Sequence, residues 1–103
     1  MTTPDDDLKF LAETDVEFGR LKGLYKALEF RLKIAEARGF VDAEGAQELR
    51  KAIARTSSDY CHLVQVFNET SIEFHTLEAQ RFTAVNKIEV WRSVNASRNR
   101  GNI

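Results

Sequence analysis

One stretch of the chain decides the fold: residues 56–91, TSSDYCHLVQVFNETSIEFHTLEAQRFTAVNKIEVW. It contains no Pro or Gly, and Thr56-Ser57-Ser58-Asp59 has the pattern of a capping box, with the acid three residues after the cap. Its apolar residues recur every seven residues on the two positions of a coiled-coil seam: Tyr60, Phe67, Phe74 and Ile88 on one, and Leu63, Leu77, Ala84 and Trp91 on the other. The stretch predicts a long helix over about 57–97, followed by a flexible polar tail over 98–103.

A second long helix is predicted over about 4–38. Thr3 and Pro4 suit an N-cap and a first helical position, and three aspartates follow at the positive end of the helix dipole. Arg38-Gly39 suits a cationic last turn and a left-handed cap. The same seam spacing recurs here, at Leu11, Phe18, Tyr25 and Leu32, and at Leu21, Leu28 and Ala35. Asp42 is the expected N-cap of a shorter helix over about 43–55.

The charges favour an antiparallel arrangement of the two long helices. Residues 1–17 carry six acids and one lysine, and residues 79–103 carry five bases and one acid. Residues 18–38 carry six bases and two acids, whereas residues 59–78 carry four acids and no base. Each surface pair contributes only a few tenths of a kcal/mol, but folding one helix back on the other pairs opposite blocks throughout. We therefore expect an all-α, coiled-coil-like hairpin in a single domain, 1–103.

Several residues do not fit a simple two-helix seam. Arg81, Asn95 and Thr70 are polar at seam positions, where such residues commonly fix register, and a functional contact is the alternative for Arg81. Seven large or β-branched apolar residues lie off the seam: Val64, Val66, Ile72, Phe82, Val85, Val90 and Val94. This excess predicts self-association. The expected interface consists of Phe67, Phe74, Phe82, Val85 and Trp91.

Composition and motifs argue against several function classes. Apolar residues make up 43% and charged residues 30%, which is typical of a folded chain outside the membrane. The single cysteine, Cys61, excludes a disulfide framework, and a reducing cytoplasm is the expected location. His62 and His75 have no acid placed to complete a metal set. No nucleotide-binding or catalytic motif is present, so we expect no enzyme activity, metal or cofactor.

The C-terminal stretch, from Leu77-Glu78-Ala79-Gln80-Arg81 through residues 88–98, IEVWRSVNASR, resembles small all-helical proteins of tailed bacteriophages. The layout is similar to that of the phage recombination mediators of the UvsY type. Those have a long first helix ending in a segment like residues 31–35, RLKIA, a short middle segment, and a long last helix with spaced arginines. The resemblance implies an oligomer in the bacterial host cytoplasm that binds single-stranded DNA and assists loading of a recombinase.

The residues expected to bind DNA are Lys87, Arg92, Arg98 and Arg100. The competing interpretation is that the basic stripes only pair with the acidic blocks, because the net charge is −1. Two other functions therefore stay open. One is a protein-binding module, such as a phage inhibitor or adaptor of a host protein, and the other is a structural coiled-coil part.

Overall fold

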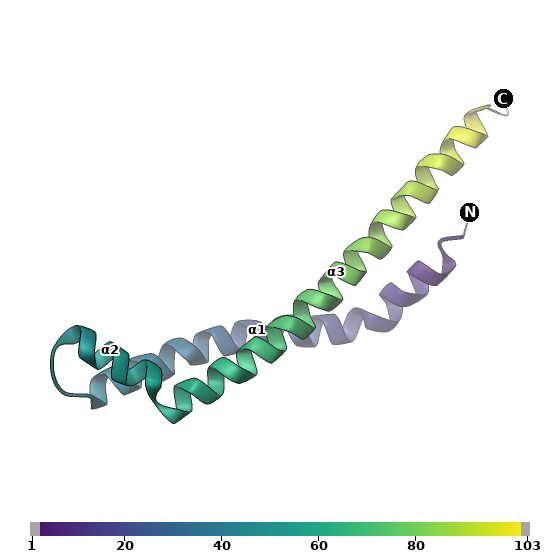
Figure 1. The fold of residues 1–103 in the computed structure, drawn as a ribbon. Helices are drawn as coiled ribbons and strands as arrows, with labels where there is room; N and C mark the ends of the chain where they lie inside the picture. Colours follow the sequence, from purple (N-terminus) through teal and green to yellow (C-terminus); the bar gives the residue numbers. More distant parts are fainter. Residues whose placement is uncertain (1–2, 102–103) are drawn as a thin grey trace. The chain divides into compact units, whose positions relative to one another are not determined.

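The computed structural model describes residues 3–101, and within them the chain forms three helices and no strand (Figure 1). The helices are α1 (Asp5–Asp42), α2 (Gln47–Thr56) and α3 (Ser58–Gly101). The start of α1 contacts the later part of α3, at Leu11 and Arg81, and the middle of α1 contacts its earlier part, at Tyr25 and Phe67. The two long helices are thus antiparallel, and the predicted all-α hairpin is confirmed.

The contacts of the chain divide it into two compact units. The first contains residues 3–19 and 75–101, and the second contains residues 20–74. Both long helices contribute to both units, whereas α2 belongs to the second alone. Across residues 3–101, no helix has a stretch long and apolar enough to cross a membrane.

The seven-residue lattice is the buried seam in both units. In the second unit Leu21 and Leu28 are buried, the latter to 2% exposure. The ring of Tyr25 stacks on Phe67 at 5.0 Å and lies 5.3 Å from Phe74. Every apolar seam residue named in the sequence is buried or half-buried. The core is therefore a narrow line of side chains, because two helices can cover only one side of each other.

The predicted end of the first helix at Gly39 is wrong: α1 continues to Asp42. Gly39 lies inside the helix, and a Cβ on it would lie 2.8 Å from both Cα and Cβ of Ala54. The glycine therefore permits close approach of α2 rather than a left-handed cap. The glycine with a positive φ, 113°, is Gly45, in the connection to α2. Asp42 accordingly ends α1 instead of capping the next helix, which begins at Gln47 and not near Ala43.

The turn between α2 and α3 is capped one residue later than predicted. Ser57, not Thr56, caps α3: its Oγ accepts a hydrogen bond from the Tyr60 amide at 3.3 Å. The same hydroxyl donates to the Ala54 carbonyl at 2.8 Å, so one side chain serves the end of α2 and the start of α3. The Thr56 hydroxyl instead donates back to the carbonyls of Ala52 and Ile53 within α2.

The helix at the C-terminal end is longer than predicted. Residues 98–101, expected in a flexible tail, form the last turn of α3, and residues 102–103 of that tail lie outside the described residues. Arg98 and Arg100 lie in this last turn, where positive charge complements the negative end of the helix dipole. Nothing interrupts the helix earlier, since no Pro follows Pro4 and the next glycine after Gly45 is Gly101.

Candidate nucleic-acid interface

The four residues predicted to bind DNA, Lys87, Arg92, Arg98 and Arg100, lie on about the last four turns of α3, and all are exposed. Residues 90–101 contain no Asp or Glu. Lys87 and Arg98 are three turns apart and share one side of the helix, whereas Arg92 and Arg100 project elsewhere. The cations therefore surround the end of the helix instead of forming one stripe.

The partners of these cations differ. Arg92 Nη1 lies 3.3 Å from Glu89 Oε1, but the Arg92 side chain is 69% exposed, so this pair contributes little to stability. Within residues 3–101, Arg98 and Arg100 form no ion pair. Lys87 likewise forms no ion pair among these residues, so Arg92 is the one of the four that has an acidic partner within residues 3–101.

A groove of about 390 Å³ lies where the beginning of α1 meets α3. The N-terminal side contributes Thr3, Pro4 and Asp7 to it. The α3 side contributes Thr83, Asn86, Lys87, Val90 and Trp91. Because α1 begins here and runs antiparallel to α3, the residues of α3 beyond Trp91 extend past the described start of α1. The basic end of α3 is thus left uncovered by α1.

Arg81 is held within the first unit. Its Nη1 donates to the Leu11 carbonyl at 2.8 Å and to Thr14 Oγ1 at 2.7 Å, and its guanidinium lies 5.0 Å from the centre of the Phe18 ring. Its Nη2 lies 3.3 Å from Asp15 Oδ1. This geometry supports the register role expected for Arg81, because every contact joins α3 to one short segment of α1.

The five residues predicted for an oligomer interface fall into two groups. Phe67 and Phe74 contact Tyr25 inside the seam of their own chain, and Trp91 is half-buried beside the start of α1. Phe82 and Val85 are exposed, Phe82 to 67%, and lie one turn apart on α3. The structure thus leaves Phe82 and Val85 available to a partner.

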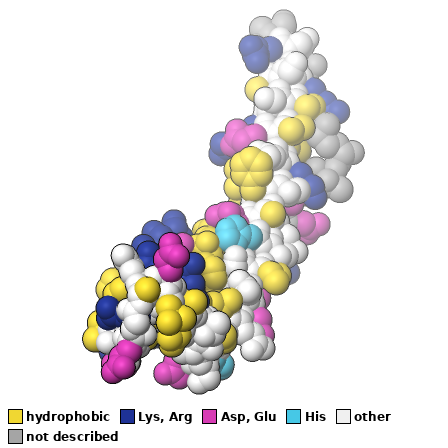
Figure 2. All heavy atoms as spheres, turned by 60° about the vertical axis from the view of Figure 1, so that its left-hand side comes forward, with side chains coloured by type: hydrophobic (Ala, Val, Ile, Leu, Met, Phe, Trp, Pro, Cys, Tyr) yellow, Lys and Arg dark blue, Asp and Glu magenta, His cyan; other side chains and the backbone are white. Residues whose placement is uncertain are grey.

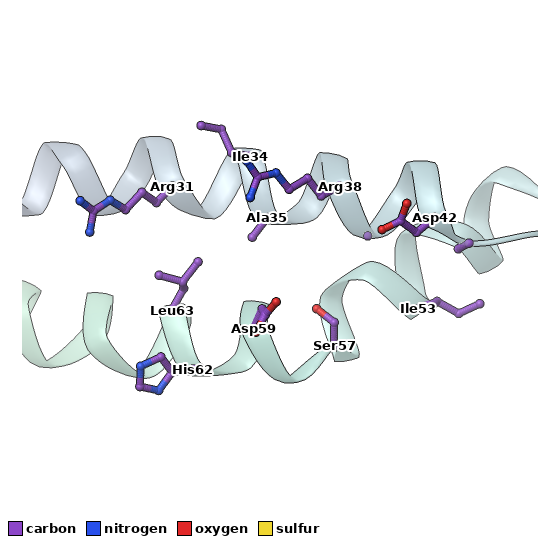
Figure 3. Close-up of a pocket in the computed structure, with 12 residues that line it drawn as sticks. Arg31, Ile34, Ala35, Arg38, Asp42, Ile53, Ser57, Asp59, His62 and Leu63 are labelled. Carbon is purple, nitrogen blue, oxygen red and sulfur yellow. The ribbon is translucent and has the colours of Figure 1, made fainter.

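The second unit contains a larger groove, of about 760 Å³, between α1, α2 and α3 (Figure 3). Ala35 and Leu63 face each other across it, while the His62 ring points away from α1 (Figure 3). Its charges balance, with Arg31 and Arg38 opposed by two aspartates, Asp42 and Asp59. Figure 2 likewise shows cationic, anionic and hydrophobic side chains interspersed over the surface at the α2 end. This groove has no single charge that selects a ligand.

No group of three or more His, Cys, Asp or Glu side chains that could hold a metal ion occurs among residues 3–101. Cys61 is exposed, and its Sγ contacts the Arg55 carbonyl at 3.6 Å.

Comparison with known proteins adds no relative to this description: no protein-family model, curated protein or solved structure matches the chain. A nucleic-acid interface is therefore supported by the residues of this chain alone.

The sequence did not predict that Asp7, Thr83 and Asn86 line one groove with Trp91. The sequence does contain a sign of this groove: the seam positions of α1 opposite Trp91 are residues 4 and 7, which are a proline and an aspartate instead of large apolar residues.

Proposed function

We propose that the protein is a non-enzymatic accessory protein that binds single-stranded DNA through the C-terminal end of α3 and acts as an oligomer. The observation that carries the proposal is a pair of exposed cations, Arg98 and Arg100, which form no ion pair within residues 3–101 and lie in a stretch, 90–101, without Asp or Glu. Cationic side chains at such a place reach phosphates without breaking the seam. The role in DNA recombination follows the resemblance to the phage mediators.

Changing Arg98 and Arg100 together to alanine is expected to weaken binding of oligothymidylate and to flatten its dependence on salt. Each phosphate contact to a single strand contributes about 0.7 to the slope of log affinity against log salt, so the slope should fall by about 1.4. Fluorescence anisotropy at several salt concentrations measures both quantities.

The matched control replaces Arg31 and Arg38, two exposed arginines on α1 in the other unit. The control removes the same charge and should leave the slope near that of the unchanged protein. Absence of binding by the unchanged protein at low salt contradicts the proposed function.

Self-association is supported by the exposed pair Phe82 and Val85 and by the charges around it. Glu78 precedes Val85 by seven residues and Arg92 follows it by seven. An antiparallel two-fold pairing of α3 centred on Val85 places Glu78 of one copy beside Arg92 of the other, and the symmetry repeats the pair. Apolar contact at the centre with complementary charges at both ends is the arrangement expected of a homodimer face.

The change Phe82→Glu is therefore expected to convert the oligomer to a monomer of 11.8 kDa without loss of helix, because this side chain is not part of the seam. Light scattering at micromolar concentration and circular dichroism measure mass and helicity. Phe30→Glu is the matched control, since Phe30 is 65% exposed but lies on the outer side of α1. A monomeric mass for the unchanged protein refutes self-association.

A protein-binding module is the second candidate, favoured by exposed apolar residues on α1 and α2. Val41, Leu49 and Ile53 are exposed in the second unit. A protein partner bound there would account for the exposure of these apolar residues without any DNA binding. Loss of partner binding on changing Leu49 and Ile53, with no DNA binding, is the result that this alternative requires.

A further inference from the structure

The half-buried side chain of Trp91 lines a groove at the start of α1. Elsewhere the seam positions of α1 carry side chains such as Leu21 and Leu28, which are buried. Opposite Trp91 the corresponding positions carry Pro4 and Asp7. Neither fills the space of a leucine against an indole, and Trp91, half-buried like most of the seam, borders a groove at this place.

The other groove residues present hydrogen-bonding groups beside the indole. Asn86 is exposed and carries two amide donors and a carbonyl acceptor. The Thr83 hydroxyl donates to the Ala79 carbonyl at 3.1 Å, which leaves its oxygen free to accept. An amide next to an aromatic ring is the combination with which proteins read an unstacked nucleobase. The volume of about 390 Å³ lies within the range of small-ligand sites, roughly 300–1,000 Å³.

The charges place the sugar–phosphate backbone outside this groove. Lys87 lines the groove and shares one side of α3 with Arg98, about 16 Å further along the helix. Asp7 lines the groove from the other helix, and its carboxylate repels phosphate while accepting hydrogen bonds from base N–H groups. A strand following Lys87 and Arg98 therefore presents its bases, and not its phosphates, to the groove.

We infer that this groove binds one unstacked base of single-stranded DNA, with Trp91 as the stacking platform and Asn86 at the base edge. The inference rests on the proposed function, because it requires a strand at the basic end of α3. The inference adds a contact to the base, so a strand with bases should bind more tightly than a sugar–phosphate backbone alone.

Trp91 is the one tryptophan of the sequence, so its fluorescence reports directly on the groove. Oligothymidylate and an abasic oligonucleotide of the same length are titrated into the full chain at low salt. Oligothymidylate should quench the emission and bind about five- to a hundredfold more tightly, as expected for one stacked base. Equal affinities without quenching overturn the inference but leave the proposed function standing. Absence of binding by either oligonucleotide overturns both.

The matched variants are Asn86→Asp and Asn68→Asp, the same change at two exposed positions of α3 in different units. Asn86→Asp places a second carboxylate in the groove and should weaken oligothymidylate binding about tenfold more than Asn68→Asp does. The new carboxylate also repels phosphate, so Asn86→Asp should weaken binding of the abasic strand as well, but by less than it weakens binding of oligothymidylate, because the abasic strand has no base contact to lose. If Asn86→Asp weakens binding of oligothymidylate and of the abasic strand equally, or no more than Asn68→Asp does, base binding in the groove is excluded.

Discussion

Replacing Gly39 with alanine is expected to lower the free energy of unfolding by about 1–3 kcal/mol, the usual cost of overpacking. In an ordinary helix interior the same change stabilises by about 1 kcal/mol. The sign reverses here because the new Cβ would lie 2.8 Å from Cα and Cβ of Ala54. Ala54 is fully buried, and a backbone atom cannot rotate away as a flexible side chain does. Urea denaturation followed by circular dichroism measures the change.

Gly23 supplies the control for this prediction. It lies in the same helix, and a Cβ on it meets nothing within 4 Å. Gly23→Ala should therefore raise the free energy of unfolding by about 0.5–1 kcal/mol. If both substitutions stabilise the protein equally, α2 does not approach Gly39 closely, and the packing of α2 on α1 is contradicted.

The seam was predictable because the repeat of apolar residues depends only on which side of a helix is covered. Spacing alone predicts Tyr25, Phe67 and Phe74 on the lattice, and in the second unit the Tyr25 ring contacts the rings of both phenylalanines. The start of α1 was likewise predictable to within one residue, since Pro4 and the aspartates act locally: the Leu8 amide donates to the Pro4 carbonyl at 2.9 Å.

The connections were less predictable because one local pattern suits two structures. Arg38-Gly39 suits the end of a helix, but a glycine also suits a place where a second helix packs closely against the first. The position of Ala54, on α2, shows that the second case applies here. Thr56 and Ser57 are both good caps, and the second was selected by the Ala54 carbonyl that it also serves. In each case the deciding group belongs to the next helix.

The candidate site was predictable in its charges but not in its shape. The basic stretch at the C-terminal end indicates Arg98 and Arg100 as phosphate ligands, but it does not indicate that both lie in the last turn of a helix. The spacing places Trp91 on the seam, yet whether a groove lies beside it depends on the residues opposite it. The register in which α1 and α3 pair decides which residues lie opposite Trp91. A seven-residue repeat does not determine this register, because shifting one helix by a whole heptad keeps the same seam. The contacts of Arg81 support a role in fixing this register, because its donors reach both a backbone carbonyl and a threonine of α1.

Arg81→Ala is therefore expected to lower the free energy of unfolding by about 2–3 kcal/mol, since hydrogen bonds from a charged group contribute about 1.5–3 kcal/mol. The Arg81 side chain is 17% exposed, and its removal leaves an extra acceptor position on Thr14 without its donor. Asp15 is 75% exposed, so Asp15→Ala should change stability by less than about 1 kcal/mol. Arg92→Ala, on the same helix, is the matched control and should have an effect of similarly small size.

A double-mutant cycle identifies which contact of Arg81 is responsible. Thr14→Val removes the hydroxyl that accepts from Arg81 at 2.7 Å and donates to the Phe10 carbonyl at 2.7 Å. If the threonine–arginine contact fixes the register, the effects of Thr14→Val and Arg81→Ala should be non-additive by about 1 kcal/mol or more. The coupling should persist at high salt, because its partner is neutral and shielded, whereas an Asp15 contribution would be screened. Additive effects, or a coupling that disappears with salt, would assign Arg81 to the surface charge pattern and leave the register to the apolar seam alone.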